Sequence, residues 1–124
     1  MTTQEKVSAI SNELKKQVQL TEESLKETCH TLALMKNDAN TYDQAFADLA
    51  SVSAINHFIL KLKGIIESGD YKKADNFIRF TCYQIEQFTT KQTLEADEPT
   101  GWCEIDAKVT VYQIFKTLVG ILDA

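Results

Sequence analysis

The sequence predicts an all-α protein, an antiparallel bundle of four or five helices, and three observations lead to this fold class. The 124-residue chain has only four glycines and one proline, so few turns are obligatory and long helices are favoured. Apolar residues recur three and four positions apart over most of the chain, the period of an amphipathic helix. A content of 44% hydrophobic residues is enough for a packed core. No repeat or linker divides the chain, so we expect one helical-bundle domain over residues 1–124.

The first helical pattern covers residues 4–35. Its apolar positions are Val7, Ile10, Leu14, Val18, Leu25, Leu32 and Met35, with Glu and Lys between them. Thr21 interrupts this stripe and, followed by Glu22 and Glu23, has the form of an N-cap that begins a new helix. No Gly or Pro marks a break there. The segment is therefore one helix or two, and the missing breaker favours one.

The two middle patterns form the predicted centre of the bundle, an antiparallel hairpin over about residues 41–90. The first of these helices begins at Thr41, which with a glutamine three residues later has the form of a capping box. Gly69 is expected in the left-handed conformation that ends this helix, and Asp70 is expected to cap the next one. The second helix covers residues 71–88, and the short link makes it fold back on the first.

The end of the chain is predicted as a loop followed by a final helix. Turn formers around Pro99 and Gly101 place the one substantial loop at residues 92–103. Residues 104–122 first alternate as a strand would and then resume helical spacing. We expect a helix throughout, because a lone strand would leave its backbone groups without partners.

Charge and cysteine content limit the classes of partner and compartment. A net charge of −5 repels a phosphate backbone, so direct nucleic-acid binding is disfavoured. Residues 2–6 are polar, and no uninterrupted apolar run approaches the roughly 20 residues that span a bilayer, so we expect a cytoplasmic protein outside the membrane. Cys29, Cys82 and Cys103 are odd in number and lack metal-binding spacing, which predicts free thiols.

One pair of residues has the spacing of a metal site. Glu27 and His30 form Glu-x-x-His, by which a helix offers a carboxylate and an imidazole to one metal ion. A two-metal bundle needs a second such pair, and the other histidine, His57, has Ala54 three residues before it. His57 is expected on the exposed side of its helix or in a hydrogen bond across the bundle. We expect no catalytic, cofactor-binding or metal-binding residue; a metal-binding bundle or enzyme using Glu27 and His30 is an alternative.

Three segments of the second half resemble a known family. Residues 65–70 (IIESGD), 101–105 (GWCEI) and 111–115 (VYQIF) are similar to the flagellin-type export chaperones, small helical bundles that sheathe the helical terminus of their client. The chain lacks that family's N-terminal tyrosine and Ser-Pro segment, and it ends without the final helix. The resemblance implies a bundle that binds a protein helix and is a second alternative. No binding residue is carried over from it.

Aromatic residues are more numerous than a single small core commonly needs. They either fill the core or form an exposed patch for a partner or a second copy. The residues in question are Phe46, Phe58, Phe77, Phe80, Tyr83, Phe88, Trp102 and Phe115.

The function we expect is a non-enzymatic protein-binding module: an adaptor, an immunity-type inhibitor or a chaperone. It would act through a helix face and the 92–103 loop, and its negative charge suits a partner with a basic surface. Within that loop we select Glu95, Asp97, Glu98 and Trp102 as partner contacts. A structural subunit of a larger assembly, including a homo-oligomer, is the third alternative.

Overall fold

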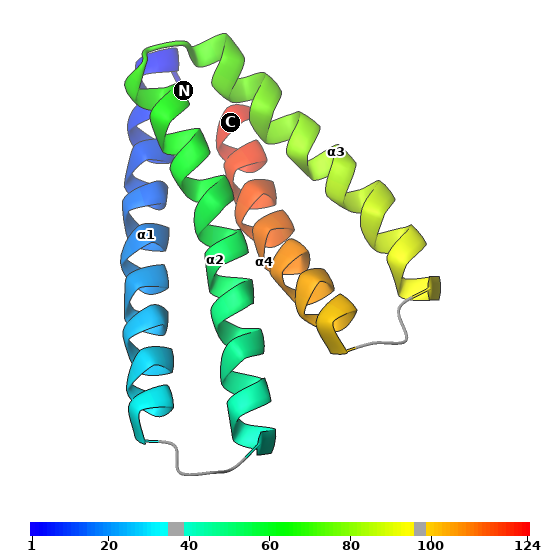
Figure 1. Cartoon of the computed structure of the whole chain (residues 1–124). Coiled ribbons are helices and arrows are strands. Elements are labelled where there is room, and N and C mark those ends of the chain that lie inside the picture. The colour runs from blue at the N-terminus through cyan, green and yellow to red at the C-terminus, as the bar shows by residue number, and fades with distance from the viewer. Residues whose placement is uncertain (35–38, 96–98) are drawn as a thin grey trace.

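The chain forms four helices. The computed structural model describes residues 1–34, 39–95 and 99–124, with side chains described for residues 1–30, 33–34, 48–87 and 107–124. The helices are α1 (Thr3–Leu34), α2 (Ala39–Glu67), α3 (Tyr71–Glu95) and α4 (Pro99–Leu122) (Figure 1). The described ranges contain no strand. The predicted all-α bundle is therefore confirmed, with four helices.

Two segments for which the sequence pattern is ambiguous, residues 4–34 and 104–122, lie in helices that have no break in the described residues. Helix α1 passes through Thr21, whose hydroxyl donates to the carbonyl oxygen of Gln17 at 2.7 Å, as a threonine inside a helix does. The prediction of one helix in the first segment is thus confirmed. Helix α4 includes residues 105–111, so their strand-like alternation does not produce a strand.

The predicted 92–103 loop is wrong in extent. Helix α3 continues to Glu95 and α4 begins at Pro99, so residues 92–95 and 99–103 are helical. Proline is favoured at the first position of a helix because no backbone N–H is needed there and its φ is already helical. The proline that suggested a loop therefore starts a helix.

The turn between α2 and α3 has the predicted chemistry. Gly69 has φ of +80°, the left-handed conformation that costs glycine no steric strain. Its N–H donates to the carbonyl oxygen of Ile66 at 3.1 Å and closes the end of α2. The carboxylate of Asp70 accepts from the N–H of Lys73 at 3.0 Å and caps α3.

Helix α2 lies at the centre of the bundle, but its main partners are not the expected ones. It packs against α1 on one side and α4 on another, whereas α3 packs mainly against α4 (Figure 1). Helices α2 and α3 diverge from their short turn, so the hairpin over residues 41–90 is present without being the tightest pair. Both chain termini lie at the end of the bundle that carries this turn (Figure 1).

The core occupies that same end of the molecule. It is built from the first half of α1, the second half of α2, the first half of α3 and most of α4, with Phe115 fully buried at its centre. The ammonium of Lys6 donates to the carbonyl oxygen of Leu122 at 2.6 Å and joins the start of α1 to the end of α4. The buried apolar side chains are Ile10, Leu14, Ile59, Leu62, Ile65, Ala74, Ile78, Cys82, Ile85, Val111, Ile114, Phe115, Leu118 and Leu122.

Beyond this core, α1 and α2 continue as a two-helix arm, which includes residues 20–34 and 48–54. None of the side chains described in these two ranges is buried. Leu25 lies on the same helical stripe as Leu14, yet it is 40% exposed whereas Leu14 is 2% exposed. The reason is that α3 and α4 diverge from this part of α1 and α2 (Figure 1).

Residues 48–67 of α2 are long and apolar enough, by length and composition alone, to cross a membrane. This stretch includes Lys61 and Lys63. Ile59 and Leu62 within it are fully buried in the bundle core. Only 11% of this stretch is buried inside the bundle, and a single helix of this kind is weak evidence for a membrane span, because a core helix of a soluble protein meets the same length and composition criteria.

Candidate functional site

The four residues predicted to contact a partner lie outside the described part of the structure. Asp97 and Glu98 fall between the described ranges, and Glu95 and Trp102 belong to helix ends whose side chains are not among those described. Their role as partner contacts therefore stays a prediction.

The residues considered for metal or acid–base chemistry are dispersed. Glu27 and His30 are both exposed on the arm, and Glu27 already takes part in another interaction. His57 is exposed on α2 and meets Phe58 edge to face, with the ring centroids 5.8 Å apart. In residues 1–30, 33–34, 48–87 and 107–124 no three His, Cys, Asp or Glu side chains converge to hold a metal ion.

Two of the cysteines are described, and both are unpaired thiols. Cys29 is exposed on the arm and Cys82 is buried in α3. Burial raises the pKa of Cys82, because the thiolate would lose solvation there. Cys82 is therefore a core side chain in its neutral form.

The aromatic residues divide between core and surface. Phe115 is fully buried, and Phe77 meets it edge to face at 5.9 Å between ring centroids. Phe80 and Tyr83, one turn apart on α3, are 58% and 59% exposed. The side chains of Phe46, Phe88 and Trp102 lie outside the described residues. Both interpretations of the aromatic surplus thus hold, for different residues.

A row of polar contacts fastens one edge of α3 to α4. Arg79 donates to Asp75 at 2.7 Å on its own helix and to Asp123 at 2.6 Å after α4. The hydrogen bond from Arg79 lowers the pKa of Asp123. Further along, the Tyr112 hydroxyl donates to the carboxylate of Glu86 at 2.6 Å, which raises the pKa of Tyr112. Along this edge, α3 is therefore held against α4 by side-chain contacts.

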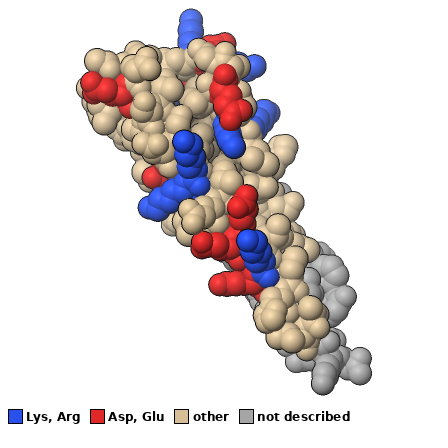
Figure 2. Space-filling model, turned by 90° about the vertical axis from the view of Figure 1, so that its left-hand side faces the viewer, with Lys and Arg blue, Asp and Glu red and all other residues tan. Residues whose placement is uncertain are grey.

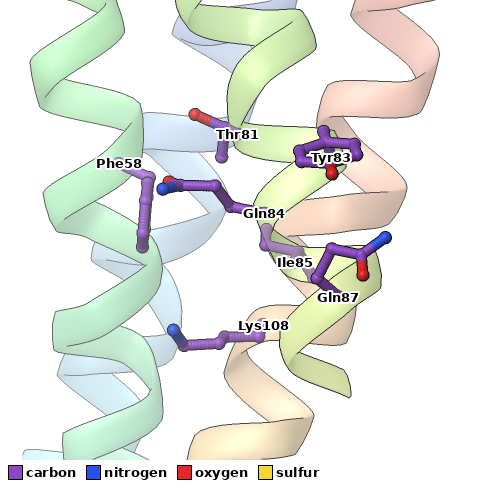
Figure 3. A pocket seen from close by; sticks show the side chains of 7 residues that line it. All are labelled: Phe58, Thr81, Tyr83, Gln84, Ile85, Gln87 and Lys108. Atoms are coloured by element: carbon purple, nitrogen blue, oxygen red, sulfur yellow. The ribbon is translucent and has the colours of Figure 1, made fainter. Parts of the chain in front are cut away.

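The other edge of α3, toward α2, is open. A groove with a volume of about 370 Å³ lies there, which we call the α2–α3 groove. Thr81 and Gln84 of α3 and Lys108 of α4 point toward α2, whereas Tyr83 and Gln87 lie on the other side of α3 (Figure 3). The groove is open to solvent and is lined by Phe58, Thr81, Tyr83, Gln84, Ile85, Gln87 and Lys108.

Thr81 is the buried polar residue of this groove. It is only 4% exposed, and no described group is a hydrogen-bond partner of its hydroxyl. Other helical threonines donate to the carbonyl oxygen one turn earlier, at 2.9 Å for Thr28 and 3.2 Å for Thr117. The Thr81 hydroxyl is instead directed into the groove (Figure 3). A buried hydroxyl without a partner is costly and is satisfied when a ligand supplies one.

The charge around the groove is opposite in sign to that of the whole chain. Among the residues with described side chains, no carboxylate lines it, although 18 residues of the chain are acidic. At the end nearer the turn, the Lys61 ammonium of α2 lies 5.4 Å from the ring centroid of Phe77 on α3. Lys108 lines the groove from α4 and also takes part in another interaction. The polar groups that the groove offers are therefore neutral or cationic.

The outer side of α1 has a different character. Acidic and basic side chains occur side by side over it (Figure 2). Its exposed charged residues include Lys15, Lys16, Glu22, Glu23, Lys26 and Glu27. Alternating charge of this kind is typical of a solvated helix face.

A second hollow, of about 310 Å³, lies beside the α2–α3 turn. Its walls include Val7, Ile66 and Tyr71, and none of the described residues that line it is charged. It lacks the convergent polar groups that give a binding site its specificity. The α2–α3 groove is therefore the stronger candidate site.

No family model, curated protein or solved structure matches the chain. The choice of candidate site therefore depends on the geometry of this structure alone.

Two of the residues that line the groove, Phe58 and Tyr83, belong to the aromatic residues that the sequence analysis counted as more than a small core needs. Sequence reasoning missed Thr81, Gln84 and Lys108. A signal for Thr81 exists, because it is a polar residue next to the apolar stripe of α3. Lys108 carries no such signal.

Proposed function

We propose that this chain is a non-enzymatic protein-binding module, an adaptor, inhibitor or chaperone that presents a helix face to another protein. The observation that carries the proposal is the exposure of Phe80 and Tyr83, each more than half exposed, on the helix that borders the α2–α3 groove. Single exposed apolar residues are ordinary. Two aromatic side chains one turn apart beside an open groove are the composition of a protein interface, where aromatic residues are enriched.

The arm adds apolar surface of the same kind. Leu20, Leu25 and Leu34 are exposed on the α1 part of the arm, and Leu60 of α2 is exposed outside the arm. Burying such side chains against a partner gains about 25 cal/mol for each Å² removed from water. The predicted contacts Glu95, Asp97, Glu98 and Trp102 belong to this proposal as additional contacts, and a basic surface on the partner would complement the three carboxylates.

The test compares co-purified proteins for three baits from the native source. The baits are the wild-type chain, the double variant Phe80→Ser/Tyr83→Ser and the control Lys72→Ser, which changes an exposed residue of the same helix. We expect one protein retained equally by the wild type and Lys72→Ser and strongly reduced on the double variant. Thermal unfolding checks that all three baits are folded.

Two results are informative beyond the expected one. The same proteins in the same amounts on all three baits would contradict the proposal. Self-association in light scattering that the double variant loses would identify a second copy of this chain as the partner.

A further inference from the structure

We infer that the α2–α3 groove binds an acidic amphipathic helix of a partner protein, with an apolar side chain against Phe58 and carboxylates toward Lys61, Thr81 and Gln84. The inference rests on the proposed function and names the chemistry of the partner. Four features of the groove support it: its shape, its apolar walls, its buried hydroxyl and its charge.

The shape favours a protein segment over a small molecule. Small-molecule pockets bury most of their ligand, whereas this groove is open to solvent. It lies between two helices that diverge from the turn at residues 68–70 (Figure 1). A gap between diverging helices matches the helix-in-groove mode of recognition, in which a third helix lays its apolar face along the first two.

The walls supply an apolar contact. Phe58 of α2 is half-buried and faces α3 across the groove (Figure 3). Ile85 lines the groove from α3 and is buried. An aliphatic or aromatic side chain of the partner would complete the burial of Phe58. Aromatic anchors in partly formed pockets of this kind dominate the energetics of interfaces.

The polar groups call for hydrogen-bond acceptors on the partner. The Thr81 hydroxyl is directed into the groove without a described partner, and the Gln84 side chain points the same way (Figure 3). A carboxylate accepts from both a hydroxyl and an amide. Such a hydrogen bond with a charged acceptor is about twice as strong as one between neutral groups.

The charged side chains around the groove indicate whether an acidic or a basic segment would bind there. Among the described charged residues, Lys108 lines the groove from α4, whereas Arg79 is paired with Asp75 and Asp123 on the opposite edge of α3. Lys61 adds a cation from α2 at the groove's end. The net charge of −5 therefore does not describe this surface, and an acidic segment complements it.

The experiment selects binders from a display library of helix-forming peptides of about 16 residues, long enough to run along the groove for about 24 Å. The full chain is the target. We expect the enriched peptides to combine an apolar stripe with a net negative charge. Fluorescence anisotropy of the best peptide then measures its Kd on the wild type and on groove variants, and chemical-shift changes locate the bound peptide.

The groove variants are Lys61→Glu, Gln84→Glu and Thr81→Val. We expect each of the two charge changes to weaken the peptide about tenfold or more. Lys72→Glu makes the same charge change on the exposed side of α3 and is expected to alter Kd by less than about threefold. Thr81→Val is expected to weaken binding without lowering the melting temperature, a combination that a purely structural role would not give.

The remaining outcomes separate the two proposals. A basic or neutral consensus, no enriched peptide, or equal effects of Lys61→Glu and Lys72→Glu would overturn the groove inference. If the selected peptides lost binding only on Phe80→Ser, a residue that is not among those lining the groove, the protein-binding proposal would stand and the groove inference would fail. If no peptide were enriched and no protein co-purified with the wild type, both would fail.

Discussion

Thr81 is a polar residue among the otherwise apolar buried side chains of the described part of the structure. Its hydroxyl is buried and has no described hydrogen-bond partner. Valine has nearly the same shape without the hydroxyl, so Thr81→Val should stabilise the fold by about 1 kcal/mol. That corresponds to a rise of about 4 °C in melting temperature, measured by circular dichroism.

Thr117→Val is the matched control for this substitution. Thr117 is exposed on α4, and its hydroxyl donates to the carbonyl oxygen of Gln113 at 3.2 Å. Its replacement should leave the melting temperature unchanged or slightly lower. If Thr81→Val were the more destabilising of the two, the Thr81 hydroxyl would have a partner in the folded protein.

Arg79 gives the molecule a pH-dependent contact at the end of α4. Because its hydrogen bond lowers the pKa of Asp123, the folded state holds this carboxylate ionised to a lower pH than the unfolded chain does. The stabilisation is therefore present above pH 3.8, the ordinary value, and is lost as the pH falls through the lower pKa of the folded state. Arg79→Gln should raise the Asp123 pKa toward 3.8.

Carbon-13 NMR titration of the Asp123 carboxyl group measures this change. Lys72→Gln removes an exposed positive charge from the same helix without touching Asp123 and serves as the control. An unchanged Asp123 pKa in Arg79→Gln would mean that the ion pair at 2.6 Å does not persist in solution.

At the scale of elements, two glycines of α2 and its turn have opposite roles. Gly69 has φ of +80°, which an L side chain rarely adopts, so Gly69→Ala should destabilise the protein by about 1 to 2 kcal/mol. Gly64 lies inside α2, and a Cβ built there meets nothing within 4 Å. Gly64→Ala should stabilise the protein by up to about 1 kcal/mol.

Urea unfolding of the two variants measures both effects by the same method. Equal effects of the two substitutions would contradict the roles given to the two positions. Because both replace glycine with alanine, the change in side-chain volume is the same, and only the backbone conformation differs.

Local chemistry explains which elements could be predicted from the sequence. Gly69 and Asp70 obey rules that involve only their immediate neighbours, so the end of α2 and the start of α3 were predictable. Pro99 obeys such a rule too, but proline is compatible both with a loop and with a helix start. The choice between the two depends on packing, which is why residues 92–103 were assigned to a loop incorrectly.

At the scale of the whole molecule, helical periodicity shows which side of α1 faces α2 but not how much else covers it. Leu14 and Leu25 lie on one stripe, and only Leu14 lies among all the helices of the core. Leu14→Ala should therefore cost about 3 kcal/mol, whereas Leu25→Ala should cost about 1 kcal/mol or less. Equal losses in chemical denaturation would mean that another part of the chain covers the arm.

The candidate groove could not be predicted for the same reason. Its walls come from α2, α3 and α4, and it exists because α2 and α3 diverge while α3 stays fastened to α4. Phe58 and Tyr83 were recognisable as aromatic residues in excess of a small core's needs. Thr81 and Lys108 line the groove only because of the angle between the helices, and no pattern within one helix specifies that angle.

The contact between Lys6 and Leu122 brings the beginning of α1 next to the end of α4, far from the tip of the arm (Figure 1). A tether attached at either end of this chain would therefore hold the molecule by the end that contains its packed core and leave the arm directed away from the support. A fluorophore or surface anchor placed at these ends would report on or restrain the core alone. Tethering through both ends at once would also hold the beginning of α1 against the end of α4.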